Sequence, residues 1–266
     1  MLSWNIFKRA VMLIVDNLGA ALRVSALPYA AFIAVNLWFA GTVDMEAIAT
    51  FDPEADPGAL PALPEGSVTA VFLTLFVQTL AFVWIAVAWH RFVLLAEGGA
   101  SWVPPLRGRE MLGYLGRSIL IVLILSAVGI ATLLLVAPIL PFVAIPLVVI
   151  LSIILSYRLG LILPAGAIGR PLTLTQAWQA TKGQSGTVVL LAILTYLAAL
   201  LLQVPALIDA MGGADLSDPA AAVEALSAPG PVAMLYNFVI SWILLMLGIS
   251  VLSTLYGHFV EGRRLD

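Results

Sequence analysis

Residues 118–157 form an apolar run without a single charged side chain. A membrane-spanning helix needs about 20 apolar residues, because each residue rises about 1.5 Å and the hydrocarbon core is about 30 Å thick. The run is about twice as long as one such helix. Pro138, Pro141 and Pro146 interrupt its middle, and proline ends or kinks a helix. The sequence therefore predicts two membrane helices joined by a tight turn.

The same apolar character extends along most of the chain. Apolar residues make up 62% of the 266 and charged residues 10%, whereas soluble domains carry about 45–50% and about 25%. The first apolar stretch ends in Leu37-Trp38-Phe39-Ala40, which is too bulky for a signal-peptidase site, so we expect it to be retained. We predict an all-α polytopic membrane protein whose residues 1–266 form a single transmembrane domain. Its six spans are expected at residues 24–41, 68–90, 118–137, 142–163, 187–208 and 231–257, and none contains an acidic residue.

The charges between these spans predict the orientation of the chain. All 12 basic residues lie in the segments 1–23, 91–117, 158–186 and 258–266, and none lies in 42–67 or 209–230. Cytoplasmic loops of membrane proteins accumulate Lys and Arg. Both termini are therefore expected in the cytoplasm. The two loops without basic residues instead carry acidic ones: Asp44, Glu46, Asp52, Glu54, Asp56, Glu65, Asp209, Asp215, Asp218 and Glu224.

Two or three cytoplasmic segments are expected to be amphipathic helices that lie in the membrane interface. In the first, an apolar stripe that includes Trp4, Phe7 and Val11 lies opposite Lys8 and Arg9. A weaker candidate covers residues 109–115, and the third begins with capping-box spacing at residues 173–176 and closes at residue 183. Each precedes a span, with a glycine (Gly19, Gly116 or Gly186) expected at the bend. This order suggests three repeated hairpins, although any multi-span protein repeats basic and apolar segments.

Four basic side chains are candidates for binding an anionic headgroup. If the fourth span begins near Phe142, Arg158 lies about 24 Å along it, just inside the cytoplasmic boundary. His90, Arg91 and His258 are expected at the same depth on the second and sixth spans. Their convergence would create a cationic pocket for a lipid phosphate. The alternative is that each side chain reaches the interface separately, at the end of its own helix.

Several kinds of chemistry are excluded or not expected. Cysteine is absent, so disulfides, thiolate zinc sites and iron–sulfur clusters are excluded. The two histidines lack carboxylate partners in a metal-binding pattern, and no acidic residue within a span could carry a proton relay. The sequence holds no recognisable catalytic set of Ser, His and Asp and no HExxH motif. We therefore expect no metal, no cofactor and no enzymatic activity.

The expected function is that of a non-enzymatic membrane protein that engages lipids or amphiphiles, or that serves as an accessory subunit. The expected partners are membrane lipids, anionic ones in particular, and another membrane protein, but not nucleic acid. The alternative function is a transporter or channel for a neutral or amphiphilic solute. It would need a continuous polar path through the spans.

One stretch of the chain carries a resemblance. It consists of Arg158, then Pro164-Ala165, and then Leu174, Ala177-Trp178 and Thr181-Lys182-Gly183, leading into a span. This pattern resembles a poorly characterised group of bacterial six-helix inner-membrane proteins, which are similar in layout to the membrane domain of some glycerophosphoryl diester phosphodiesterases. The soluble catalytic domain of those enzymes has no counterpart here, so no catalytic residue can be transferred. The resemblance implies a six-helix fold in a bacterial inner membrane.

Overall fold

The computed structural model of the chain describes residues 2–43, 66–98, 101–212 and 230–265, and leaves out the side chains of residues 210–212. Within these ranges the secondary structure is helical and contains no strand. Most of the two acidic loops predicted at 42–67 and 209–230 lies outside the described residues. The predicted all-α polytopic membrane fold is confirmed, because six of the described helical segments are long and apolar enough to cross a membrane.

The six predicted spans correspond to long helices, and most of these helices extend beyond the predicted ends. Once a helix is nucleated, each added residue gains a backbone hydrogen bond at little cost, so it continues into the polar flank of an apolar stretch. Arg91 consequently lies inside a helix instead of following it. The helices are α2 (Leu18–Thr42), α4 (Ser67–Leu95), α5 (Gly108–Val136), α6 (Pro141–Leu159), α9 (Ser185–Gly212) and α11 (Pro231–Phe259).

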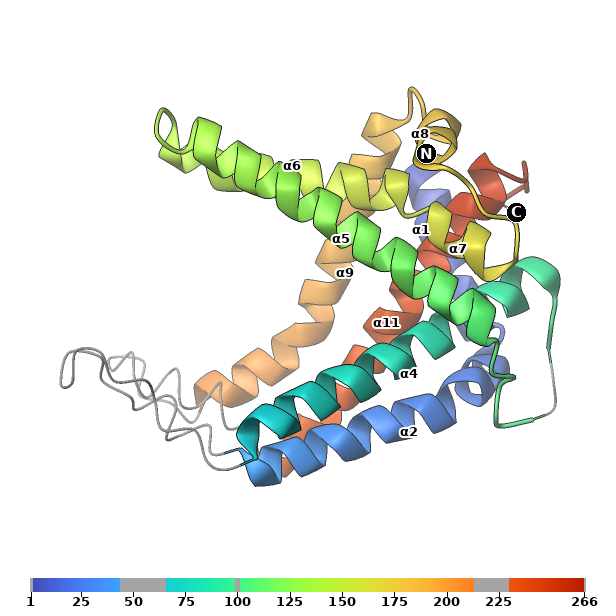
Figure 1. Cartoon of the computed structure of the whole chain (residues 1–266), viewed down its shortest axis with the longest axis vertical. Coiled ribbons are helices and arrows are strands. Elements are labelled where there is room, and N and C mark those ends of the chain that lie inside the picture. Colours follow the sequence, from blue (N-terminus) through green and yellow to red (C-terminus); the bar gives the residue numbers. More distant parts are fainter. Residues whose placement is uncertain (1, 44–65, 99–100, 213–229, 266) are drawn as a thin grey trace. The chain divides into compact units, whose positions relative to one another are not determined.

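The predicted turn within the uncharged run is confirmed. Helix α5 ends at Val136, and α6 begins at Pro141, where proline suits the first helical position because its missing N–H has no partner there. The two helices run back along each other as a hairpin (Figure 1). Near its tip, Ile139 and Phe142 are largely exposed. Such a surface suits lipid contact.

The long helices α2, α4, α9 and α11 contribute to two compact units of the chain. The first unit comprises residues 1–25, 83–199 and 244–266. Its core surrounds the short helix α7 (Ile162–Ala167), in which every residue except Leu163 is buried. Helix α11 contributes Val251 and Leu255 to this core. The candidate site residues all belong to this unit.

The second unit comprises residues 26–82 and 200–243 and is held by aromatic side chains. The ring of Phe32 lies 5.1 Å from that of Phe82 and 6.1 Å from that of Phe238. The Tyr29 hydroxyl donates a hydrogen bond of 2.6 Å to the Phe238 carbonyl, and the Tyr236 hydroxyl donates one of 2.5 Å to the Leu202 carbonyl. These bonds satisfy polar groups that lipid could not satisfy.

Two of the three short amphipathic segments form separate helices. Helix α8 (Leu174–Ala180) has the predicted capping box between Thr173 and Gln176, and Gly183 follows with a φ of +79°. The segment 109–115 is instead the beginning of α5, which continues through Gly116, so the expected bend is not formed there. A glycine in a helix costs only about 1 kcal/mol relative to alanine, which the apolar continuation outweighs.

The first amphipathic segment is α1 (Leu2–Val15). The face that it buries against the protein is not centred on the predicted apolar stripe of Trp4, Phe7 and Val11. Ser3, Ile6 and Ala10 are buried, and the small side chains of Ser3 and Ala10 let the helix approach its neighbours closely. Phe7 is half-buried against the same core, and Trp4 is 52% exposed. The chain bends after α1 at residues 16–17, so Gly19 lies within α2.

Candidate functional site

His90 lies in the core of the first unit, because α4 continues past it to Leu95. Its side chain is fully buried, and Nδ1 lies 2.8 Å from the Ser253 hydroxyl of α11. The Tyr114 hydroxyl of α5 lies 3.5 Å from Nε2. One position earlier, Trp89 Nε1 donates a hydrogen bond of 2.8 Å to the Ser250 hydroxyl. His90 therefore connects three helices of this unit.

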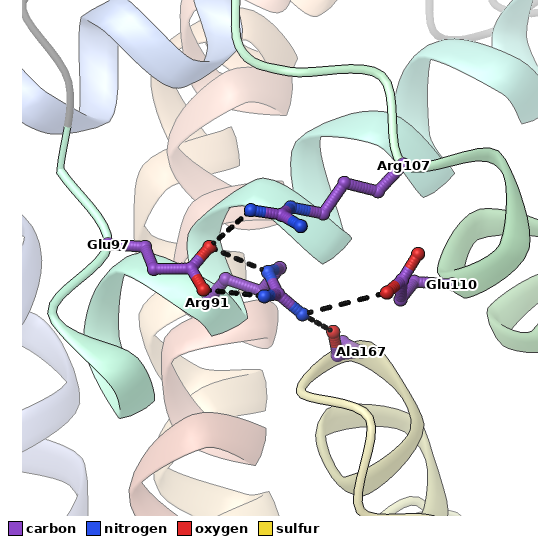
Figure 2. A network of polar contacts seen from close by, with 5 residues as sticks. All are labelled: Arg91, Glu97, Arg107, Glu110 and Ala167. Atoms are coloured by element: carbon purple, nitrogen blue, oxygen red, sulfur yellow. Dashed lines mark hydrogen bonds and ion pairs between the residues drawn. The ribbon is translucent and has the colours of Figure 1, made fainter.

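Arg91, the next residue, is bound on two sides (Figure 2). It is only 9% exposed, and its Nε and NH2 groups donate hydrogen bonds of 2.8 and 2.5 Å to the two carboxylate oxygens of Glu97. Its NH1 group donates to the Ala167 carbonyl at 2.9 Å, where α7 ends, and lies 4.0 Å from a Glu110 oxygen. This two-pronged pairing is the strongest arrangement available to an arginine and a carboxylate. Arg91 is therefore firmly held by groups of its own chain.

Glu97 is placed for this contact by the way α4 ends. Ala96 adopts a φ of +54°, the left-handed conformation that few residues other than glycine adopt readily. The Glu97 amide then donates a long hydrogen bond of 3.4 Å back to the Arg91 carbonyl. The carboxylate of Glu97 also accepts a hydrogen bond of 2.9 Å from Arg107 NH2. The turn thus directs Glu97 back toward the helix from which it departs.

The two arginines lower the pKa of Glu97. The hydrogen bond from Arg91 is the largest cause of the lower pKa, burial opposes it, and the charges of Arg91 and Arg107 and the hydrogen bond from Arg107 add smaller lowering effects. Glu97 is therefore ionised at neutral pH and neutralises part of the charge of its two partners.

A cavity of about 620 Å³ adjoins this ion-pair network. Three guanidinium groups and one carboxylate contribute to its wall, and most of the remaining wall is apolar. We call it the Arg91 cavity. It is lined by Ala20, Arg23, Val24, Val87, Ala88, Arg91, Phe92, Glu97, Gly98, Ser101, Val103, Pro104, Pro105 and Arg107. An apolar wall beside an excess of positive charge can receive a molecule with an apolar part and an anionic group.

Arg158 lies in a different cluster, at the end of α6. It is 5% exposed, and its guanidinium carbon lies 4.4 Å from the centre of the Trp178 ring. Its NH2 group donates a hydrogen bond of 2.6 Å to the hydroxyl of Ser185, the first residue of α9. Its Nε is buried and has no hydrogen-bond partner. We call Arg158, Trp178 and Ser185 the Arg158 cluster.

His258 is half-buried near the end of α11, and its Nδ1 lies 3.1 Å from the Arg263 carbonyl. It lines a groove of about 720 Å³ together with Lys8, Arg9 and Arg264. The four predicted site residues are thus distributed over the Arg91 cavity, the Arg158 cluster, this groove and the core around His90. Among the residues that line the Arg91 cavity, Arg91 is the only one of the four.

Sequence reasoning missed Glu97, Arg107 and Arg23 as neighbours of Arg91. The sequence does contain a signal for these ion pairs, because few acidic residues lie in the segments that hold the basic ones. Of these, Glu97, Glu110 and Glu261 each lie within 4.0 Å of an arginine nitrogen. An acidic residue within an otherwise basic segment thus points to an ion pair.

The described part of the chain contains no group of three or more His, Asp and Glu side chains arranged to hold a metal ion. Comparisons with protein families, with curated proteins and with solved structures found no match for this chain.

Proposed function

We propose that this chain is a non-enzymatic multi-pass membrane protein that binds an anionic lipid, or an amphiphile of similar chemistry, in the Arg91 cavity. The observation that carries the proposal is the mixed wall of that cavity, in which three arginines and one glutamate adjoin a mainly apolar lining. Since Glu97 already occupies one edge of Arg91, we expect Arg107 to contribute most to ligand affinity. Its side chain is 37% exposed and donates one bond, to Glu97.

The volume and position of the cavity suit one headgroup with the beginning of its acyl chains. A volume of about 620 Å³ falls in the range of about 300–1,000 Å³ typical of small-molecule sites. Val87, Ala88 and Phe92 belong to α4, a helix long and apolar enough to span a membrane. A bound amphiphile would place its acyl chains along this helix and its anionic group near Arg107.

The location proposed for the protein is a bacterial inner membrane, with both termini in the cytoplasm. The partition of the 12 basic residues supports the orientation, and the resemblance of residues 158–183 supports the membrane. A second membrane protein is the other proposed partner. The exposed apolar surface of the α5–α6 hairpin, which includes Leu134 and Leu135, is the surface on which such a partner would replace lipid.

A transporter or channel for a neutral or amphiphilic solute is the alternative proposal. It is favoured by Pro28, Pro146 and Pro205, which lie inside α2, α6 and α9. Proline removes a backbone hydrogen bond and kinks a membrane helix, and transporters use such breaks at their binding sites. Reconstituted vesicles distinguish the two functions, because only a transporter would move a fluorescent amphiphile from one leaflet to the other or release an internal solute.

Native mass spectrometry tests the lipid proposal. The purified protein is mixed with equal amounts of phosphatidylglycerol and phosphatidylcholine, and the retained lipid is identified. We expect phosphatidylglycerol to predominate, and Arg107→Gln to weaken its binding about fivefold, as the loss of one charge-assisted hydrogen bond at a partly exposed site would.

Arg109→Gln is the matched control for this experiment. Arg109 is exposed, lies two positions from Arg107 and does not line the cavity. Arg109→Gln therefore changes the net charge by the same amount as Arg107→Gln but leaves the cavity wall intact. A third variant, Ala88→Phe, should fill the apolar part of the cavity and displace lipid without changing any charge. Equal retention of the two lipids by the wild type, or equal effects of Arg107→Gln and Arg109→Gln, would contradict the proposal.

A further inference from the structure

The Arg158 cluster contains a buried positive charge without a matching negative one. An arginine side chain stays protonated in proteins, so burial cannot remove its charge. Within the described residues no carboxylate lies within ion-pairing distance of Arg158, whose side chain bonds to the Ser185 hydroxyl and lies against the Trp178 ring. A buried, unneutralised charge is costly unless an anion accompanies it.

The unpaired Nε of Arg158 indicates where such an anion would bind. The Nε and NH2 groups of a guanidinium share one edge, which fits two oxygens of a carboxylate or phosphate. In Arg91 this edge is filled, with both groups bonded to the Glu97 carboxylate. In Arg158 the buried Nε of this edge has no partner, and NH2 bonds to one hydroxyl, that of Ser185. The edge therefore retains a donor that an oxyanion could accept from.

The beginning of α9 adds a second contribution at the same position. Ser185 is the first residue of this helix of 28 residues, and the first N–H groups of a helix have no partner within it. These groups and the helix dipole favour an anion. A Cβ added at Gly186 would meet no atom within 4 Å, so there is space on that side of the first turn.

We propose that Arg158, Trp178 and the first turn of α9 bind a phosphate group. The Nε and NH2 groups of Arg158 would donate to two phosphate oxygens, the amides of Ser185 and Gly186 would donate from the helix end, and the Trp178 ring would fix the plane of the guanidinium. The ligand is either the headgroup of an anionic lipid or free inorganic phosphate. This inference goes beyond the lipid cavity and does not depend on it, since the two sites share no residue.

Two measurements distinguish these sources in the purified full-length protein. The first compares the thermal unfolding midpoint in inorganic phosphate and in sodium chloride of equal ionic strength. The second measures the retention of phosphatidylglycerol against phosphatidylcholine by native mass spectrometry. A midpoint raised by inorganic phosphate would indicate that the free ion binds. Selective retention of phosphatidylglycerol that Arg158→Gln reduces, without that rise, would indicate a lipid phosphate.

In either measurement Arg158→Gln should weaken binding about tenfold or more, because the paired hydrogen bonds to a charged group are lost. Arg158→Lys keeps the charge but lacks the two-pronged edge, and it should lose a similar factor, which provides a test if Arg158→Gln fails to fold. Lys182→Gln is the matched control, because Lys182 is exposed and lies close to α9 in the sequence. It should change binding less than twofold.

Arg107→Gln separates this site from the Arg91 cavity, since it should leave the effect of inorganic phosphate unchanged. Three results would overturn the inference. They are no selective effect of either phosphate source on the wild type, unchanged binding in a folded Arg158→Lys protein, or equal losses in Arg158→Gln and Lys182→Gln.

Discussion

Arg91 and Arg158 are both buried arginines near the ends of apolar helices, yet their surroundings differ. Arg91 bonds to both oxygens of Glu97 and to the Ala167 carbonyl, all within its own chain. Arg158 bonds to a single hydroxyl and lies against an indole ring. The first is neutralised by the fold, and the second leaves donor capacity for an external anion. A position near the end of an apolar helix therefore does not by itself indicate whether an arginine is neutralised within the chain.

The largest expected effect is the loss of the carboxylate that neutralises Arg91. Glu97→Gln removes the negative charge and leaves a buried guanidinium with weaker acceptors. Breaking a buried pair costs about 3–5 kcal/mol. Since Glu97 is 38% exposed, water compensates part of this loss, and we expect the free energy of unfolding to fall by about 2 kcal/mol. Denaturation in mixed micelles measures this change, with Arg109→Gln as the control. A loss below about 0.5 kcal/mol would show that Arg91 does not depend on Glu97.

The partner of Arg158 should matter less. Ser185→Ala removes one hydrogen bond at an exposed residue, and we expect the free energy of unfolding to fall by about 1 kcal/mol or less. Binding of phosphate should persist in this variant, because the vacated position on NH2 is the one proposed for a phosphate oxygen. The same denaturation assay, run with and without phosphate, measures both the free energy of unfolding and the stabilisation by bound phosphate. A loss as large as that of Glu97→Gln would indicate that Ser185 is a structural partner equivalent to Glu97.

The contribution of Glu97 to the free energy of unfolding should also depend on pH. The pKa of Glu97 is lower in the folded protein than in the unfolded chain, so its contribution to stability is present above the unfolded pKa of about 4.3. That contribution is lost as the pH falls through the lower, folded pKa. The difference in unfolding free energy between wild type and Glu97→Gln should therefore shrink below about pH 4.3 and stay constant from pH 6 to 8. A difference that is independent of pH down to pH 3 would contradict the role given to this carboxylate.

The smallest expected effect concerns the turn that places Glu97. Ala96 has a φ of +54°, which costs an L-residue about 1 kcal/mol relative to glycine. Ala96→Gly relieves this strain but gives the unfolded chain more freedom, so the free energy of unfolding should rise by about 0.5 kcal/mol. Ala165→Gly is the control, because Ala165 is a buried helical residue and its replacement should be destabilising. Destabilisation by Ala96→Gly would mean that the turn is not strained.

The sequence predicts the spans well, because the thickness of the membrane sets their length and Pro138 and Pro141 define the turn between two of them. It also predicts that Arg91 and Arg158 lie near the ends of apolar helices, since counting residues along a helix gives their position. It does not indicate their partners. The spans are apolar on nearly all sides, so no pattern shows that His90 faces Ser253 and Tyr114.

The partner of Arg91 depends on a feature that sequence reasoning cannot detect. Glu97 reaches Arg91 because the chain reverses at Ala96. Alanine is the residue with the highest helix propensity, so the residue itself gives no sign of a left-handed conformation at position 96. The partner of Arg158 similarly depends on packing, because Ser185 lies far from it in sequence and is adjacent only once α8 and α9 have folded.

The difference between the two arginines can be measured directly by NMR of their Nε–H groups. The protein is labelled with ¹⁵N-arginine in micelles, and the Arg91 and Arg158 signals are assigned with the corresponding lysine variants. On titration with inorganic phosphate or with short-chain phosphatidylglycerol, the Arg158 signal should shift and saturate, and inorganic phosphate should leave the Arg91 signal in place. A shift of the Arg91 signal alone, or equal shifts of both signals in inorganic phosphate, would contradict this account.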